Sequence, residues 1–177
     1  MITIETASDS TPEGLSTSTL TRFLNRARTA IGLRGTVDVL LTTDSALRRL
    51  NKTFRRKDKP TDVLSFPAPA AFAKQHAGDL AISIDIAAHQ AKAFAHPLIV
   101  EIKILILHGL LHLAGEDHET DQGQMATREA NLRRELRLPA TLIERTTRTT
   151  KKNHLTTTKR PQKTTQNAPS KSRRGGK

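Results

Sequence analysis

The sequence predicts an α+β fold, a single compact domain in which helices pack on a mixed β-sheet. Two observations lead to this prediction. Segments of strand-like sequence follow each other directly in one part of the chain and are separated by helical segments elsewhere, an order that favours a mixed sheet. Residues 97–114 are apolar on nearly every side of a helix, so we expect them to form a buried central helix.

The first half of the chain begins with a strand and a helix. Residues 1–5 alternate as a strand does, and residues 16–31 place apolar side chains at helical spacing behind Ser and Thr capping residues. Residues 36–41 are β-branched and apolar, which predicts a second strand. A short helix is expected to begin at Asp44, with an apolar face formed by Ala46, Leu47 and Leu50.

The middle of the chain begins with a loop at 54–61, because this segment is polar and basic and ends near a proline. Residues 63–66 and 79–84 are strand-like, and the connection between them is rich in Pro and Ala and holds Gly78. A helix is expected over 85–95. The directions of the strands stay open.

The last third carries the central helix and one further helix. Pro97 suits a first helical turn, and we expect the central helix to run from there to about Ala114. Gly115 is a candidate for a left-handed C-cap. Residues 121–136 predict a last amphipathic helix, which ends before Pro139.

The charge divides the chain into a domain and a tail. All 17 acidic residues lie within 1–144, together with 18 of the 29 basic residues, whereas 145–177 holds 11 Lys and Arg, no acid and almost nothing apolar. We therefore expect a folded domain at 1–144 and a basic, disordered tail at 145–177. The tail favours a polyanionic partner, although a purely solubilising role stays open. If it binds RNA, deleting 146–177 will flatten the salt dependence of binding.

The composition excludes several classes of protein. Without cysteine the chain has no disulfide, thiolate zinc finger, iron–sulfur cluster or cysteine nucleophile, so any metal must be held by histidines and carboxylates. The first ten residues carry acids where a secretory signal is basic and then apolar, and no membrane span is visible. We expect a cytoplasmic protein with neither a membrane partner nor a nucleotide cofactor. Because the chain has only five Phe, no Trp and no Tyr, we do not expect an aromatic platform for RNA bases.

The segment 108–118 has the spacing of a metal site. His108 and His112 stand four residues apart, which puts both rings on one face of a helix, and Gly115 could turn the chain so that His118 joins them. Three neutral imidazoles suit zinc and leave a fourth position for water or substrate. The competing interpretation is a set of hydrogen-bonded core histidines. We favour a metal because three of the seven histidines lie within 11 residues.

The neighbouring residues bear on the reaction. Gly109 stands where HExxH metalloproteases have their glutamate, so a protease mechanism of that kind is disfavoured. A zinc ion can still make water nucleophilic at neutral pH. Phosphodiester cleavage also needs a cation at the phosphate, and the run 55–57 offers three, of which an arginine is best suited. Taken alone, a basic run of this kind is more often a solvated loop.

Three blocks of sequence resemble the YbeY family of bacterial endoribonucleases. Residues 108–118, HGLLHLAGEDH, are similar to the family signature H-G-x-L-H-L-x-G-x-D-H, and residues 51–67 and 78–83 are similar to two further blocks in family order. The resemblance implies a compact α+β fold and one Zn²⁺ held by His108, His112 and His118. It also implies that these histidines and Arg55 serve catalysis.

The same resemblance implies a cellular role and shows two departures. The expected activity is single-strand endoribonuclease cleavage of rRNA precursors, including processing of the 16S rRNA 3′ end, together with small-subunit association and ribosome quality control. Phe54 replaces the usual tyrosine of the family, and Arg56 replaces a common glycine.

Two other functions stay in competition with the nuclease. One is a non-catalytic ribosome-assembly factor that binds RNA and holds a structural zinc. The other is a metal hydrolase of another substrate, such as a peptide, which Gly109 disfavours. Glu116 and Asp117 are weaker candidates for proton handling or for orienting a ligand histidine.

Overall fold

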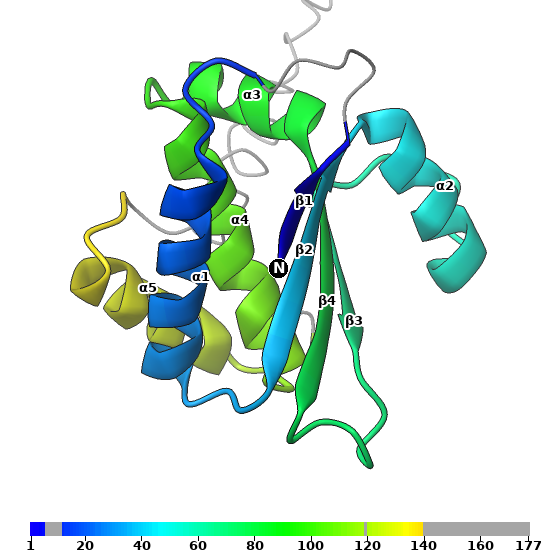
Figure 1. Cartoon of the computed structure of the whole chain (residues 1–177), viewed down its shortest axis with the longest axis vertical. Coiled ribbons are helices and arrows are strands. Elements are labelled where there is room, and N and C mark those ends of the chain that lie inside the picture. The colour runs from blue at the N-terminus through cyan, green and yellow to red at the C-terminus, as the bar shows by residue number, and fades with distance from the viewer. Residues whose placement is uncertain (6–11, 119, 140–177) are drawn as a thin grey trace, which may run out of the picture.

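The domain is a four-stranded mixed sheet with helices on both faces (Figure 1). In the computed structural model of the chain, residues 1–5, 12–118 and 120–139 are described, so the predicted boundary at 144 and the tail lie outside the described residues. The strands are β1 (Ile2–Ile4), β2 (Thr36–Thr42), β3 (Val63–Pro67) and β4 (His76–Ser83), in the order β1-β2-β4-β3. β1, β2 and β4 are parallel, and β3 pairs antiparallel with β4 at the edge. The α+β prediction with a mixed sheet is confirmed.

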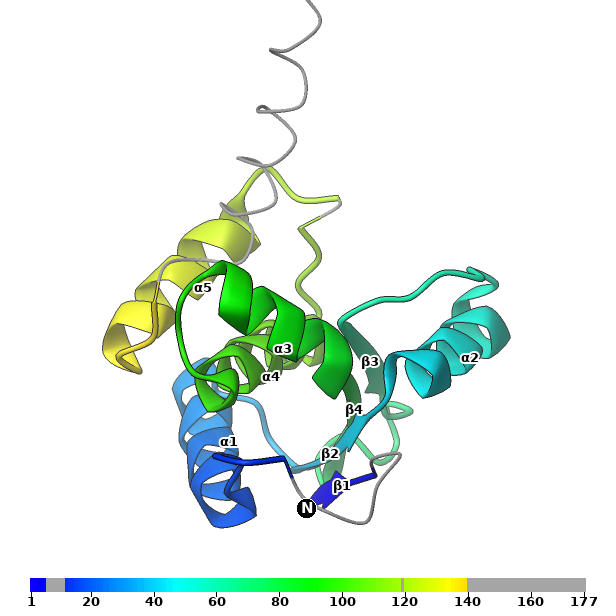
Figure 2. The same ribbon diagram turned by 90° about the horizontal axis from the view of Figure 1, so that it is seen from above.

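Four of the five helices in the described part of the chain form one layer. α1 (Thr17–Ile31), α3 (Ile84–Ala93) and α5 (Gln124–Glu135) surround α4 (Leu98–Leu113), which packs on the sheet (Figure 2). The remaining helix, α2 (Asp44–Arg55), lies on the opposite face against β3 and β4. Figure 1 shows the two layers with the sheet between them.

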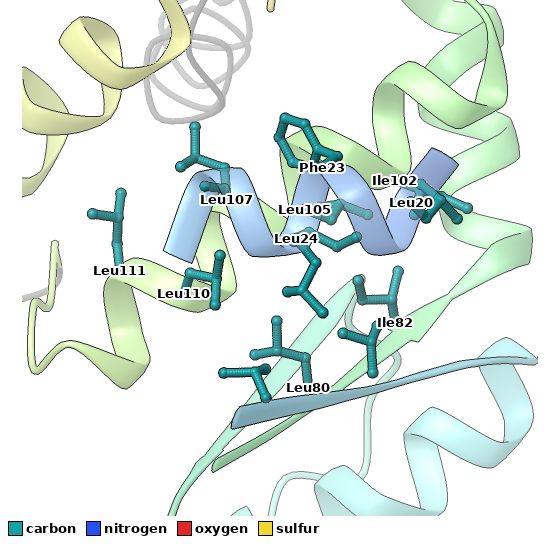
Figure 3. Close-up of a cluster of buried hydrophobic side chains, with 14 of the residues drawn as sticks. Leu20, Phe23, Leu24, Leu80, Ile82, Ile102, Leu105, Leu107, Leu110 and Leu111 are labelled. Carbon is teal, nitrogen blue, oxygen red and sulfur yellow. The ribbon is translucent and has the colours of Figure 1, made fainter. Parts of the chain in front are cut away.

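The hydrophobic core explains this arrangement. The larger cluster joins α1 and α4 to the side chains that one face of the sheet presents, and Figure 3 shows Leu24 of α1 facing Leu80 and Ile82 of β4. Because side chains alternate along a strand, Ala81 points to the other face, where it packs with Leu47 of α2 and Leu64 of β3. The central helix is as buried as its sequence predicts, with most of its residues below a tenth exposed.

Local hydrogen bonds set the helix ends. The backbone N–H of Ala46 donates to the side chain of Thr43, which caps α2. At the other end Arg56 adopts a left-handed conformation, with φ 56°, and stops the helix. The loop predicted at 54–61 therefore begins two residues later, and Arg55 belongs to the last helical turn. The predicted strand 79–84 is also wrong at its start, since β4 begins at His76.

Gly109 allows α4 to approach the sheet closely. A Cβ at this position would lie 2.8 Å from Leu80 Cδ2 and 3.3 Å from Ser65 Oγ. The Ser65 hydroxyl of β3 donates to the Gly109 carbonyl at 3.2 Å. Packing therefore favours a glycine here, because a larger residue would have to displace the buried Leu80 side chain.

No helix in the described ranges has both the length and the apolar character needed to cross a membrane; α3 and α4 meet those criteria only together, as a pair bent by 114°.

Candidate metal centre

The structure brings the three histidines of the 108–118 segment together. His108 and His112 lie one turn apart at the end of α4, with their Nε2 atoms 3.1 Å apart. Gly115, with φ 89°, turns the chain after the helix, and the His118 ring lies 5.2 Å and 5.3 Å from the other two ring centres. One ring nitrogen from each lies within 4.8 Å of the others, so the group could hold a metal ion.

The donor set fits a tetrahedral metal ion. With Zn–N bonds of 2.0–2.1 Å, two ligand nitrogens of a tetrahedral site are about 3.3 Å apart. The observed Nε2–Nε2 distance of 3.1 Å is close to that value. Exposure to solvent increases across the cluster: His108 is buried, His112 is half-buried and His118 is exposed. The cluster therefore opens to solvent on one side.

The electrostatics of the cluster favour a neutral imidazole at His112. Burial lowers the pKa of His112, and the charges of His108 and His118 lower it further. A hydrogen bond with the backbone of Glu116 and the charge of Asp117 oppose this shift but do not cancel it. His112 is therefore unprotonated at neutral pH, which is the state that a metal requires.

A buried carboxylate on α5 orients His108. Burial raises the pKa of Glu129, but its hydrogen bond with His108 and the nearby Arg133 lower it to about 2. As an ionised carboxylate Glu129 can only accept, so His108 Nδ1 donates to its Oε2 over 3.0 Å. His108 Nε2 then keeps its lone pair and faces His112. The same arrangement supports many metal-bound histidines.

Arg133 completes this network. Its Nε and Nη2 donate to the other carboxylate oxygen of Glu129 at 2.8 Å and 2.5 Å, and both side chains are almost fully buried. This pair was not predicted from the sequence, although a signal was present. Glu129 and Arg133 follow Met125 at intervals of four, so all three lie on the buried face of an amphipathic helix. Because an unpaired charge is costly to bury, this spacing predicts that the two charged residues pair with each other.

The two acids named as candidates from the sequence hold the turn after α4. Glu116 forms an ion pair with Arg128, whose Nη2 also donates to the carbonyl of Ile31 at 2.7 Å. The backbone carbonyl of Asp117 accepts from the N–H groups of Thr120 and Asp121. These contacts fix the segment that carries His118.

Arg55 lies on the other side of the sheet from the histidines. It is exposed at the end of α2, and its guanidinium makes no hydrogen bond or ion pair within the described part of the chain. The edge strand β3 lies between it and α4, since Phe66 contacts Phe54 while Ser65 bonds to Gly109. The two parts of the predicted site therefore flank one strand.

Two histidines outside the 108–118 segment have acidic neighbours. His76 lies 3.3 Å from Asp79, near Asp38, but the amino group of Met1 already pairs with Asp38 on this exposed surface. His96 contacts the buried Glu101 at 2.8 Å, at the opposite end of α4 from the metal cluster. His89 is exposed and His154 lies outside the described residues.

Comparisons with known proteins show what the chain is similar to. The family model described as "Endoribonuclease YbeY" matches residues 2–137. A protein of that name from Koribacter versatilis is 56% identical over 139 residues, which cover 78% of this chain and 90% of the relative. Another from Solibacter usitatus is 47% identical over 134 residues, covering 76% and 88%. The solution structure of a Thermotoga maritima protein matches with a TM-score of 0.51 and 27% identity, covering 77% of this chain and 89% of that one.

Proposed function

Because the chain belongs to the YbeY endoribonuclease family, we propose that it is a metal-dependent endoribonuclease that cleaves single-stranded RNA. The observation that supports this most directly is the convergence of His108, His112 and His118, with Nε2 of His108 aimed at Nε2 of His112. Three imidazoles on a surface that opens to solvent suit a catalytic ion better than a closed structural one.

We infer that the resident ion is one Zn²⁺, held by these three histidines. Neutral imidazole ligands without thiolates fit zinc, and three protein ligands leave one position for a fourth group. When bound, the ion would polarise the phosphodiester and supply a water nucleophile at neutral pH.

The protein's own side chains would prepare the site for this chemistry. Glu129 takes the hydrogen bond from His108 Nδ1 and so leaves Nε2 as the nitrogen that faces the other two rings. The burial that lowers the pKa of His112 favours the neutral form of the second ligand. Arg55 is exposed and can bind two oxygens of a phosphate with its planar guanidinium, so we assign it to the scissile phosphate.

We assign the activity to the maturation of rRNA precursors in the cytoplasm, including processing of the 16S rRNA 3′ end, and to ribosome quality control on the small subunit. The relatives are named as endoribonucleases, which supports an RNA substrate. The net charge of +12 also suits a polyanionic partner.

The test is a cleavage assay with nuclease-free, zinc-loaded protein on end-labelled single-stranded rRNA precursor. We expect His112→Ala and Arg55→Glu each to reduce the cleavage rate by about 100-fold or more, as loss of a charge-stabilising group does elsewhere. His89→Ala on α3 and Arg22→Glu on α1 make the same chemical changes at exposed positions and should leave the rate unchanged. Cleavage that survives both His112→Ala and Arg55→Glu would remove these residues from the mechanism.

A non-catalytic assembly factor with a structural zinc is the second candidate, because the buried pair Glu129–Arg133 ties the metal cluster to the core. Chelation separates the two functions. The main core packs α1 and α4 on the sheet through apolar side chains, which need no metal ion to hold them together, so we expect the apo protein to stay folded by circular dichroism and to lose cleavage until zinc is restored. Unfolding on chelation, with RNA binding that needs no metal, would favour the assembly factor.

A further inference from the structure

Phe54 is an exposed aromatic residue at the end of α2. Its exposed fraction is 64%, higher than that of any other phenylalanine in the described ranges. It is not a loose side chain, because its ring makes a T-shaped contact with Phe66 of β3, with the ring centres 5.2 Å apart and the planes at 74°. Phe66 therefore holds the ring while more than half of the side chain remains open to solvent.

The surface around Phe54 is strongly basic. Residues 48–59 contain seven Lys and Arg and one acid, Asp58. Asp58 is already paired, since its two oxygens bond to Arg48 Nε at 2.7 Å and Lys52 Nζ at 3.0 Å. The next three residues after Phe54, which we call the 55–57 triplet, form no ion pair with any described residue. The triplet is thus available to an external anion.

The backbone that carries the triplet is fixed. The N–H of Arg56 donates to the carbonyl of Lys52 at 3.1 Å, and that of Lys57 to the carbonyl of Asn51 at 3.3 Å. Asn51 is itself 2% exposed, and its Nδ2 donates to the carbonyl of Lys59 at 2.8 Å. A ligand would meet these cations on an ordered backbone, so little entropy is lost in arranging them.

This basic surface is continuous with the edge strand beside the metal cluster. Phe66, which holds the Phe54 ring, is the neighbour of Ser65, and Ser65 bonds to Gly109 next to His108. Successive side chains of β3 therefore reach α2 on one face and α4 on the other. An RNA molecule that contacts both α2 and the metal cluster therefore has to cross only β3.

We propose that Phe54 binds single-stranded RNA by stacking on a base, while the 55–57 triplet contacts the adjacent phosphates; this rests on the proposed nuclease function. An aromatic face among cations is the arrangement by which proteins hold single strands with little regard to sequence. The small number of aromatic residues argued against an aromatic platform, but one exposed and supported ring is enough for one base. Stacking here would set the register of the strand relative to the histidines.

The absence of Trp and Tyr from the chain makes a direct test possible. Phe54→Trp introduces the only tryptophan, next to the proposed base. We expect its fluorescence to be quenched saturably by a single-stranded RNA oligonucleotide and little by an abasic strand of equal length, with the RNA checked as intact on a gel. Phe94→Trp is the matched control, because Phe94 is 44% exposed at the opposite end of α4 from the histidines, and it should not respond.

Kinetics supply the second readout. Stacking of one base predicts that Phe54→Ala raises KM by about 5- to 150-fold. The turnover number should stay within about twofold, because the ring binds substrate and does not touch the reacting atoms. Phe54→Trp should retain a KM near that of the wild type.

The outcomes separate this proposal from the proposed function. If the wild-type protein cleaves RNA but the fluorescence of the Phe54→Trp variant is not quenched, or is quenched equally by the abasic strand, stacking at Phe54 is wrong while the nuclease assignment stands. If the wild-type protein does not cleave RNA, the nuclease assignment is wrong, and the fluorescence titration still decides whether bases stack at this position.

Discussion

The substitution Glu129→Gln should weaken both the fold and the metal site. The side chain keeps its shape and one carbonyl oxygen but loses the charge that Arg133 and His108 share. Arg133 is 1% exposed, so its guanidinium would be left in the core without a counter-charge. His108 would lose the partner that fixes the position of its ring proton.

The magnitude follows from the pKa of Glu129. Its ordinary value is 4.5, and its contacts with His108 and Arg133 outweigh burial and lower it to about 2. At 1.36 kcal/mol per pKa unit, the ionised carboxylate contributes about 3 kcal/mol to stability at neutral pH. This agrees with the loss of roughly 3–5 kcal/mol that follows removal of one partner from a buried ion pair. Loss of a hydrogen bond behind a ligand histidine should also weaken zinc binding by about 10- to 100-fold.

Urea denaturation measures the first effect and competition with a zinc-binding dye the second. Glu135→Gln is the matched control, because Glu135 lies on the same helix and is exposed, and it should change stability by less than about 0.5 kcal/mol. Adding Arg133→Met to Glu129→Gln should recover about half or more of the lost stability, since the stranded charge is then gone. Zinc affinity should stay low in the double variant.

Two results would refute this reasoning. If Glu129→Gln and Glu135→Gln have the same denaturation midpoint, the buried ion pair does not stabilise the fold. If Glu129→Gln binds zinc as tightly as the wild type, the carboxylate does not orient His108.

Three further predictions concern the fold. Gly78→Ala should lower the stability of the fold by about 2 kcal/mol or more, because φ is 143° and a Cβ would collide with a carbonyl oxygen of β3. Gly32→Ala, with φ 78° and no atom within 4 Å, should lower it by only about 1 kcal/mol, and equal shifts in the thermal melts of the two variants would contradict this. Since the folded pKa of Glu129 is the lowered one, stability should be full above its ordinary pKa and fall between about pH 5 and pH 2, and urea midpoints flat over that range would contradict this. Ser65→Ala removes the hydrogen bond to the Gly109 carbonyl and should cost about 1 kcal/mol, which an unchanged urea midpoint would disprove.

The sequence was most informative where a pattern depends on neighbouring residues. The helix predicted at 16–31 and the strand at 36–41 agree with α1 and β2 to within one residue, because apolar spacing directly reflects which side faces the core. The convergence of His118 with His108 and His112 could be anticipated for the same reason, since all three lie within 11 residues and only one glycine turn separates them.

The remaining features depend on contacts between distant segments. The order β1-β2-β4-β3 places the last strand, β4, inside the sheet and leaves β3 at the edge, and nothing in the local sequence encodes that choice. Glu129 was missed because its partner His108 lies 21 residues away on another helix. The end of α2 was misplaced because the polar character of 54–61 predicts exposure, and an exposed helical turn is as polar as a loop.

The position of β3 at the edge of the sheet has a mechanical consequence. The cations at the end of α2 and the histidines at the end of α4 lie on opposite faces of that strand, so an RNA that places its scissile phosphate between Arg55 and the histidines must curve over the edge of β3. A flexible unpaired strand can make that bend at little cost, whereas a double helix resists bending over such a short length. The protein would then discriminate against double-stranded RNA because a duplex is too stiff to bend over the width of a single β-strand.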